Sequence, residues 1–285
     1  MTIRSPITAI HVITTGWGEI HREHREGTWL PRILWALTSR SWVKIPINCF
    51  LLVHNDGPVL FDAGLDPAIA TRPDYISSAI IRFLTHRIFR LHINEDDRLD
   101  RKLGAAGFDA ADIRTIAFSH LHFDHTGGIA CVPQAQLIVS KEEWAILSER
   151  HPENEWIFRE HIELPSAKWQ PVAFTPVEDE ALAMFGASHD LMGDGSMILL
   201  PTPGHTPGST SMLVRSQELP PILLIGDITF EAEFLMRDQT PGTGDARQLR
   251  ATYEKVRELK RNMPGLLIVP SHNAAAADAL RAACR

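Results

Sequence analysis

The feature that most constrains this chain is the stretch of residues 119–128, in which three histidines and one aspartate lie within six consecutive positions. It reads Ser-His-Leu-His-Phe-Asp-His-Thr-Gly-Gly and follows the apolar run 115–118. The run predicts a short buried strand, and the paired glycines predict a sharp turn of the backbone. His120 and His122 are two residues apart, so extended backbone directs both side chains to the same side. Imidazole and carboxylate groups gathered in this way favour a metal site for zinc, or for iron, manganese or cobalt.

The same arrangement, an apolar strand that ends at a metal-binding residue type, recurs three times later in the chain. The run 196–200 leads to His205, the run 221–225 to Asp227, and the run 266–269 to His272. A turn or a helix cap would account for any one of these residues alone. Their joint occurrence at strand ends favours one shared site. We assign no role to the other nine of the 14 histidines.

Counting the ligands predicts two metal ions. The first set is His120, His122 and His205, the second set is Asp124, His125 and His272, and Asp227 bridges the two. Three protein ligands with an open position are typical of catalytic sites, whereas structural zinc is closed by four. Two metals about 3.5–4 Å apart polarise an acyl oxygen and lower the pKa of bound water to about 7. We therefore predict a hydrolase that uses a metal-bridging hydroxide and no protein nucleophile.

Composition and charge limit the remaining possibilities. The 285 residues, 44% apolar and 22% charged, fit one α/β domain over residues 1–285. A net charge of −7 argues against a nucleic-acid partner. Three scattered cysteines, Cys49, Cys131 and Cys284, indicate a reducing compartment. Because we find no secretory signal and no apolar run near the roughly 20 residues of a membrane span, we expect a cytoplasmic protein with no membrane partner.

Local patterns predict several further elements. A first strand is expected over 7–15, ended by Gly16-Trp17-Gly18, and a hairpin over 47–61 around Asn55-Asp56-Gly57-Pro58. Helices are expected over 75–93, 97–107, 141–150 and 245–262. The helix over 75–93 could face the core or form an apolar lid, and the segment 19–44 could cover a sheet edge or line a pocket. Asp62, after the hairpin, either closes a turn or orients a metal-bound histidine.

The ligand pattern, in this order and spacing, resembles the metallo-β-lactamase superfamily. The resemblance implies a four-layer αβ/βα sandwich with the metals at one edge of the two sheets. Within the superfamily, the motif His-Leu-His-Phe-Asp-His-x-Gly-Gly, the strand and turn over 59–64 and the short tail are similar to the N-acyl homoserine lactonase family. That similarity implies opening of the lactone ring of N-acyl homoserine lactones with two divalent ions, Zn²⁺ first among them. It also implies a homodimer by analogy.

One position departs from the lactonase pattern. These lactonases typically carry a tyrosine three residues after the bridging aspartate, where its hydroxyl assists the carbonyl oxygen. Here Phe230 stands at that position. Loss of an oxyanion donor can cost about 10²–10³ in rate. Three explanations stay open: Thr229 or another polar group substitutes, the metals suffice alone, or the substrate is not the usual lactone.

The resulting hypothesis assigns roles to the site residues. The bridging hydroxide attacks the lactone carbonyl, and Asp227 orients it and relays a proton to the leaving alkoxide. Asp124 and Asp227 are the catalytic carboxylates. Phe123, Phe230 and part of the segment 29–42 line an apolar acyl pocket, and Thr229 contacts the substrate.

Other functions share these ligands. A glyoxalase-II-like thioesterase would need a C-terminal helical region, and only thirteen residues follow His272. A true β-lactamase would carry a secretory signal, a superfamily nuclease an insertion domain and basic surfaces, and a flavodiiron protein a glutamate in place of His122. Hydrolysis of another lactone, a thioester, a phosphotriester or an arylsulfate stays open. A non-catalytic metal-binding protein is the alternative of a different class, although it would not need an open bridged site.

Overall fold

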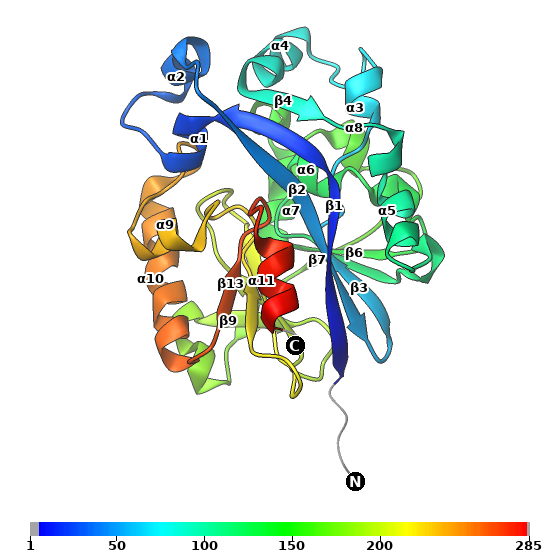
Figure 1. Ribbon diagram of the computed structural model, residues 1–285, viewed down its shortest axis with the longest axis vertical. Helices are drawn as coiled ribbons and strands as arrows, with labels where there is room; N and C mark the ends of the chain where they lie inside the picture. The colour runs from blue at the N-terminus through cyan, green and yellow to red at the C-terminus, as the bar shows by residue number, and fades with distance from the viewer. Residues whose placement is uncertain (1–5, 284–285) are drawn as a thin grey trace.

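Two β-sheets packed face to face form the centre of the molecule (Figure 1). The structure is a computed structural model that describes residues 6–283. The strands are β1 (Ile7–His21), β2 (Trp42–His54), β3 (Gly57–Phe61), β4 (Phe89–His92), β5 (Thr115–Ala117), β6 (Gln136–Ser140), β7 (Lys168–Val172), β8 (Thr175–Pro176), β9 (Ala187–Asp190), β10 (Met197–Pro201), β11 (Thr210–Val214), β12 (Ile222–Leu224) and β13 (Leu267–Val269). The first sheet has the order β4-β1-β2-β3-β5-β6-β7, and the second has the order β13-β12-β11-β10-β9-β8.

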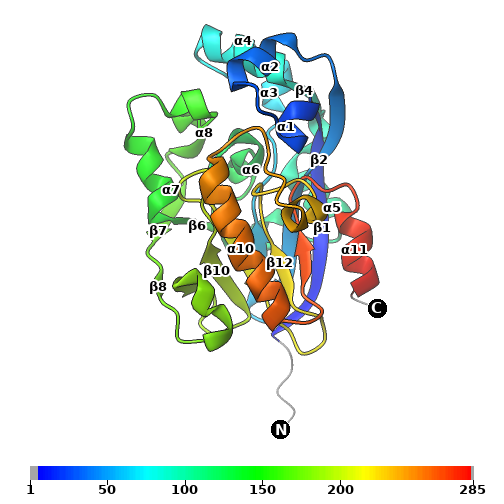
Figure 2. The same cartoon turned by 90° about the vertical axis from the view of Figure 1, so that its left-hand side faces the viewer.

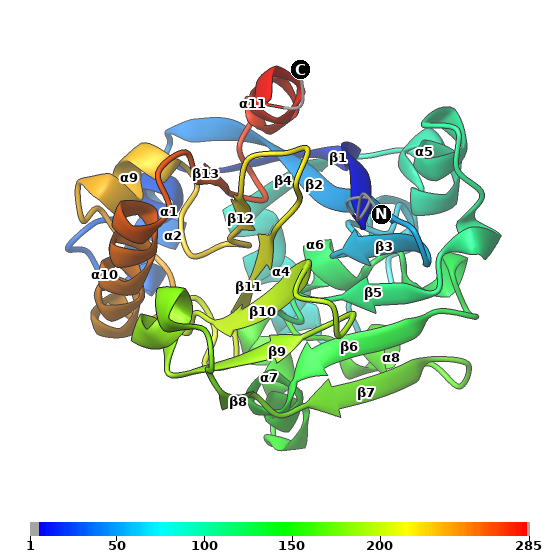
Figure 3. The same ribbon diagram turned by 90° about the horizontal axis from the view of Figure 1, so that it is seen from below.

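Helices cover the outer faces and one end of the sheets. They are α1 (Arg22–Glu26), α2 (Arg32–Thr38), α3 (Ala68–Thr71), α4 (Ala79–Ile88), α5 (Leu99–Ala105), α6 (Phe123–Thr126), α7 (Lys141–Ala145), α8 (Arg159–Ile162), α9 (Ala232–Met236), α10 (Ala246–Asn262) and α11 (Ala276–Ala283). Figure 2 shows α10 across the outer face of the second sheet, and Figure 3 shows α5 on the opposite side of the molecule.

The packing of side chains defines four layers. Phe50 and Phe61 of the first sheet pack with Leu199 and Met212 of the second in the cluster between the sheets. A second cluster joins the outer face of the first sheet to α5, and a third joins the outer face of the second sheet to α10. Apolar residues on both faces of each sheet are buried in this way. The αβ/βα sandwich implied by the resemblance is confirmed.

A separate cluster holds the end of the molecule that lies at the top of Figure 1, where α1, α2, α4 and β4 gather. Trp35 of α2, Ile81 of α4, Phe123 of α6 and Trp156 are buried in it together. This group of elements, residues 22–38 and 79–92, covers the ends of β1 and β2.

Two sequence-based expectations about this end are wrong. Gly16 does not end the first strand: β1 continues to His21, and the register with β2 shifts between Thr14 and Trp17. Gly16, with φ +131°, absorbs this irregularity because a glycine adopts such a conformation without steric cost. The helix expected over 75–93 is shorter, since α4 starts after its cap Ser78 and the chain then pairs with β1 as β4.

Other local expectations are confirmed. β2 and β3 form the hairpin, with Gly57 at φ +118°. Asp245 caps α10 by accepting hydrogen bonds from Arg247 N and Gln248 N. The described residues contain no helix that is both long and apolar enough to cross a membrane.

Candidate metal centre

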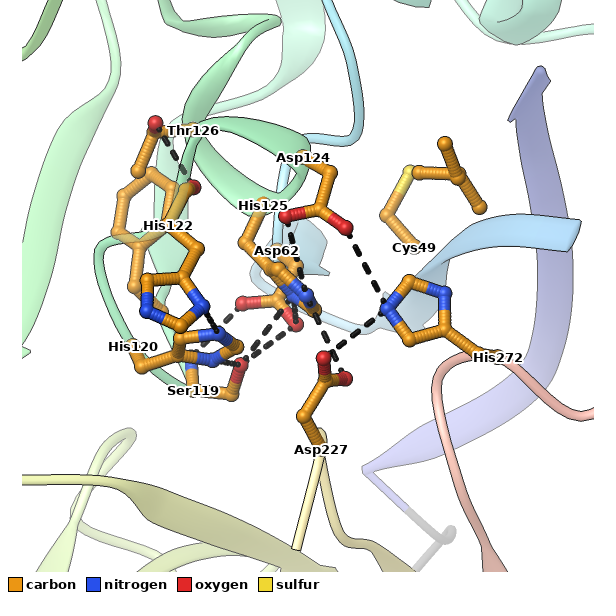
Figure 4. A network of polar contacts seen from close by, with 12 residues as sticks. Cys49, Asp62, Ser119, His120, His122, Asp124, His125, Thr126, Asp227 and His272 are labelled. Atoms are coloured by element: carbon orange, nitrogen blue, oxygen red, sulfur yellow. Dashed lines mark hydrogen bonds and ion pairs between the residues drawn. The ribbon is translucent and has the colours of Figure 1, made fainter. Parts of the chain in front are cut away.

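Loops at one edge of the two sheets bring the seven predicted ligands together. Figure 4 labels all of them except His205. The loop after β5 carries His120 and His122, and α6 directly follows with Asp124 and His125. The loops after β10, β12 and β13 carry the other three, which are His205, Asp227 and His272. Within each of three overlapping groups, the potential ligand atoms all lie within 4.8 Å of one another; the groups are His120–His122–His205, His120–His125–Asp227 and Asp124–His125–His272.

The first set is made of three imidazoles that face one point. His122 Nδ1 lies 3.0 Å from His120 Nε2 and 3.1 Å from His205 Nε2. Nitrogens bound to one tetrahedral zinc at 2.0–2.1 Å would lie roughly 3.3 Å apart. His122 Nδ1 is therefore spaced from the other two nitrogens approximately as one zinc ion requires, and all three lie within 4.8 Å of one another.

The second set mixes carboxylate and imidazole. His272 Nε2 lies 3.5 Å from Asp124 Oδ2, and His125 Nε2 lies 3.9 Å from Asp124 Oδ1. The Asp227 carboxylate lies between the sets, with Oδ2 3.0 Å from His272 Nε2 and 3.7 Å from His205 Nε2. Asp227 is thus the side chain that approaches both sets, as a bridging ligand must.

Two features of the side chains fit bound cations. Among the described residues, His125 Nε2 and Asp227 Oδ1 are buried without a hydrogen-bond partner, although they lie 3.4 Å apart. Unpaired buried polar atoms are rare in folded proteins and call for an ion or water. Burial, reinforced by the neighbouring imidazoles, holds the pKa of His120 and His122 well below its usual range. These rings are therefore neutral at pH 7, which is the protonation state that binds metal.

Hydrogen bonds at Nδ1, the ring nitrogen that faces away from the centre, orient the two imidazoles of the second set. Asp62 Oδ2 lies 2.8 Å from His125 Nδ1, so the imidazole donates there and keeps Nε2 free for the centre. Asp62 also accepts from the Ser119 amide at 2.7 Å and from the Ser119 hydroxyl at 2.8 Å. His272 Nδ1 donates to the Pro46 carbonyl at 2.8 Å. Of the two roles left open for Asp62, the structure supports orientation of a histidine.

The paired glycines of the motif serve close packing. Gly127 and Gly128 have φ values of −61° and −85°, which any residue can adopt. A Cβ on Gly127 would lie 2.2 Å from Asp66 N, and one on Gly128 would lie 2.4 Å from Ala63 O. The backbone turns at both glycines as expected, but the turn itself does not require glycine, and the glycines are needed because they let the motif lie directly against the loop that holds Asp62.

Glu143 is a buried residue of the site that the sequence did not indicate. It is 0% exposed and accepts hydrogen bonds from Leu121 N at 2.9 Å and Thr206 Oγ1 at 2.6 Å. One carboxylate thus ties the loop of His120 and His122 to the loop of His205. Burial raises its pKa to about 7, against the effect of these hydrogen bonds.

A cavity of about 320 Å³ opens from the ligands. His122, Asp124, His205, Asp227 and His272 form its polar end, and its walls are mostly apolar and aromatic; among them are Ile20, Ile45, Phe89, Phe123, Trp156 and Phe230. This volume lies at the lower end of the range for small-molecule sites.

Two of the three predicted substrate-contacting residues line the cavity. Phe123 and Phe230 line the cavity, but Thr229 does not. Thr229 is 1% exposed and its hydroxyl donates to the Glu231 carbonyl, so the expectation that Thr229 contacts substrate is wrong. Of the segment 29–42, Arg32 reaches the cavity, whereas Trp29 is 90% exposed.

Comparisons with known proteins agree with this geometry. A family model described as the metallo-beta-lactamase superfamily matches residues 42–272. The N-acyl homoserine lactonase AttM of Rhizobium radiobacter is 30% identical over 220 residues, which are 76% of this chain and 76% of that protein. The N-acyl homoserine lactonase AiiA of Bacillus thuringiensis subsp. kurstaki is 26% identical over 80% of this chain and 82% of its own length.

Solved structures share the fold. The structure of an N-acyl homoserine lactone hydrolase with its product N-hexanoyl-L-homoserine at the catalytic metal centre superposes with a TM-score of 0.74 at 22% identity, covering 100% of this chain and 98% of that one. The dizinc quorum-quenching lactonase AidC gives a TM-score of 0.61 at 19% identity, with coverage of 96% and 92%. Together with the family match over residues 42–272, these findings establish that the chain belongs to the metallo-β-lactamase superfamily.

Proposed function

We propose that this protein is a metal-dependent hydrolase that opens the ester ring of N-acyl homoserine lactones. The observation that carries the proposal is the convergence of seven donor side chains, five of which form the polar end of a mostly apolar cavity. A lactone ring with an acyl tail matches such a cavity, because its reacting ester is polar and its tail is apolar. The similarity to lactonases over three quarters of the chain supports the same substrate class.

The proposed cofactors are two divalent ions, with Zn²⁺ as the first candidate. His120, His122 and His205 would hold one ion, Asp124, His125 and His272 the other, and Asp227 would bind both. Two such ions supply polarisation of the ester carbonyl and a water molecule of lowered pKa. The spacing of the imidazole nitrogens and the unpaired atoms of His125 and Asp227 support this assignment.

The chain's own groups then position the reactants. We assign the Asp227 carboxylate, which lies between the two ligand sets, to hold the attacking water's proton and return it to the leaving alkoxide. The two carboxylate oxygens of Asp124 face different histidines: Oδ1 lies 3.9 Å from His125 Nε2, and Oδ2 lies 3.5 Å from His272 Nε2. Phe123 and Phe230 exclude water from the acyl side of the cavity.

The test is proton release by purified zinc-loaded protein on a panel of acyl homoserine lactones, simple lactones, thioesters, phosphotriesters and arylsulfates. Turnover of the acyl homoserine lactones above the other classes is the expected result. Turnover confined to another class would reject the proposed substrate class but leave the proposed metal centre unaffected. Two bound metals with no turnover across the panel would instead favour a non-catalytic metal-binding protein.

Three further features belong to the same proposal. The chain forms one domain over 1–285, acts in the cytoplasm and assembles as a homodimer. Cys49 and Cys131, which carry free thiols, support a reducing compartment, while Cys284 lies outside the described residues. Exposed Ile33, Leu37 and Phe83 on α2 and α4 offer an apolar surface for a second copy. Light scattering and cell fractionation test assembly and location.

A further inference from the structure

A buried histidine outside the ligand sets, His24, lies in the wall of the cavity. It is the buried residue of α1 and is 6% exposed. Its Nδ1 has no hydrogen-bond partner among residues 6–283. The ring instead contacts aromatic rings, with centroid distances of 5.8 Å to Trp35, 5.6 Å to Phe89 and 5.7 Å to Phe230.

Such a placement does not serve the fold. An imidazole in an apolar wall loses its hydration, and a polar atom left unpaired there destabilises the folded state. A phenylalanine would fill the same space among Trp35, Phe89 and Phe230 without that cost. Because Nδ1 is itself buried, the structure points to Nε2 as the atom that meets a partner entering through the cavity.

The position of His24 along the cavity indicates which part of a ligand it meets. Phe230 stacks on the ligand His272, with ring centroids 5.7 Å apart and an interplanar angle of 25°. The ring of Phe230 also packs edge to face on His24. The His24 ring also packs edge to face on Phe89, which lines the same cavity. His24 thus lies in the aromatic part of the cavity wall, separated from the ligand His272 by the ring of Phe230.

The ring carries one N–H to donate at neutral pH. Burial, and after it the charge of His205, lowers the pKa of His24 to about 3. A neutral imidazole has one donor and one acceptor nitrogen. A carbonyl oxygen is the complementary group.

An N-acyl homoserine lactone has its amide at the matching place, between the lactone ring and the acyl chain. We infer that His24 donates a hydrogen bond to the amide carbonyl oxygen of the bound substrate and thereby selects acyl homoserine lactones over lactones without an amide. This inference rests on the proposed function. It makes His24 a specificity-determining residue and leaves the metal ligands unchanged.

The experiment compares H24F and H24Q with wild type on two substrates: an N-acyl homoserine lactone and an alkyl γ-lactone of similar length that lacks the amide. H86F, at an exposed histidine of α4, is the matched control. We expect H24F to lose about 10-fold in kcat/KM on the amide substrate, mainly through KM, with little change on the alkyl lactone. H24Q, which retains a donor, should recover part of the loss. The dissociation constant of the ring-opened acyl homoserine should rise in H24F by a similar factor.

Stability separates this role from a structural one. Because the imidazole is unpaired, H24F should keep or raise the melting temperature of the metal-loaded protein. A loss shared equally by both substrates, or no loss on either, would overturn the inference. So would a lowered melting temperature together with weaker turnover of both lactones. A wild-type protein inactive on acyl homoserine lactones would instead reject the proposed function before any variant is tested.

Discussion

Asp62 Oδ2 lies 2.8 Å from His125 Nδ1, in a contact that joins the turn after β3 to the second ligand set. Asp62 is fully buried and has φ +66°, a left-handed conformation that asparagine and aspartate tolerate better than other residues with a Cβ. The aspartate therefore combines a backbone requirement with an electrostatic one. An asparagine at this position would keep the first and lose the second.

The D62N variant is accordingly expected to fold but to bind its second metal ion about 10- to 100-fold more weakly. The amide can still accept from the Ser119 N–H, but it no longer stabilises the N–H of His125 as a carboxylate does. Competition with a chromophoric chelator measures the affinity, and circular dichroism controls for folding. Two ions held as tightly as in wild type would show that Asp62 does not orient His125.

Removal of the charge of Asp227 is expected to lower kcat by about 10² or more. Asp227 is the carboxylate close to both ligand sets, so D227N weakens the bridge as well as the proton transfer. Metal content by elemental analysis and turnover are measured on the same sample. D74N, at an exposed aspartate, is the control. Full activity with two metals in D227N would refute the bridging assignment.

Glu143 predicts a pH dependence of stability. Its pKa, raised by burial to about 7 from an ordinary 4.5, makes the folded state bind a proton more tightly than the unfolded state. The stability contributed by this group is therefore fully present below pH 4.5 and is lost as the pH rises through 7. The glutamine of E143Q does not titrate. Between pH 4.5 and 7, the free energy of unfolding of E143Q should therefore rise relative to that of wild type by on the order of 3 kcal/mol. Urea unfolding of the metal-free proteins at several pH values measures the difference, and parallel curves would contradict the assignment.

A hydroxyl at position 230 should accelerate lactone opening. Phe230 lines the cavity and stacks on His272, so a tyrosine there places an O–H donor close to the ligands. One oxyanion donor contributes about 10²–10³ in rate in other hydrolases, and we expect F230Y to gain about 10-fold in kcat because another group already serves the substrate. F123Y, in the same cavity, is the control. An unchanged kcat would mean that no donor is missing at this position.

The ligands could be predicted from the sequence because each group follows a short apolar strand, and these strands of the two packed sheets end at one shared edge. The same reasoning could not separate two roles for Asp62, since only the tertiary structure places His125 beside it. Glu143 and His24 gave no signal at all. One is an acidic residue in the first turn of a helix and the other lies in a polar run, and their burial depends on segments far away in the chain. The end of the first strand was predicted wrongly at Gly16, because the sequence alone does not distinguish a glycine inside a strand from a glycine that ends one.

The order of the ligands along the chain has a consequence for biosynthesis. The three-imidazole set is complete once the ribosome has added His205, whereas the other set requires His272, which is made later, as is the bridging Asp227. A nascent chain can therefore capture one ion while the second sheet still lacks β12 and β13. An ion bound early at the first set would hold the loops after β5 and β10 together while the remaining strands are added.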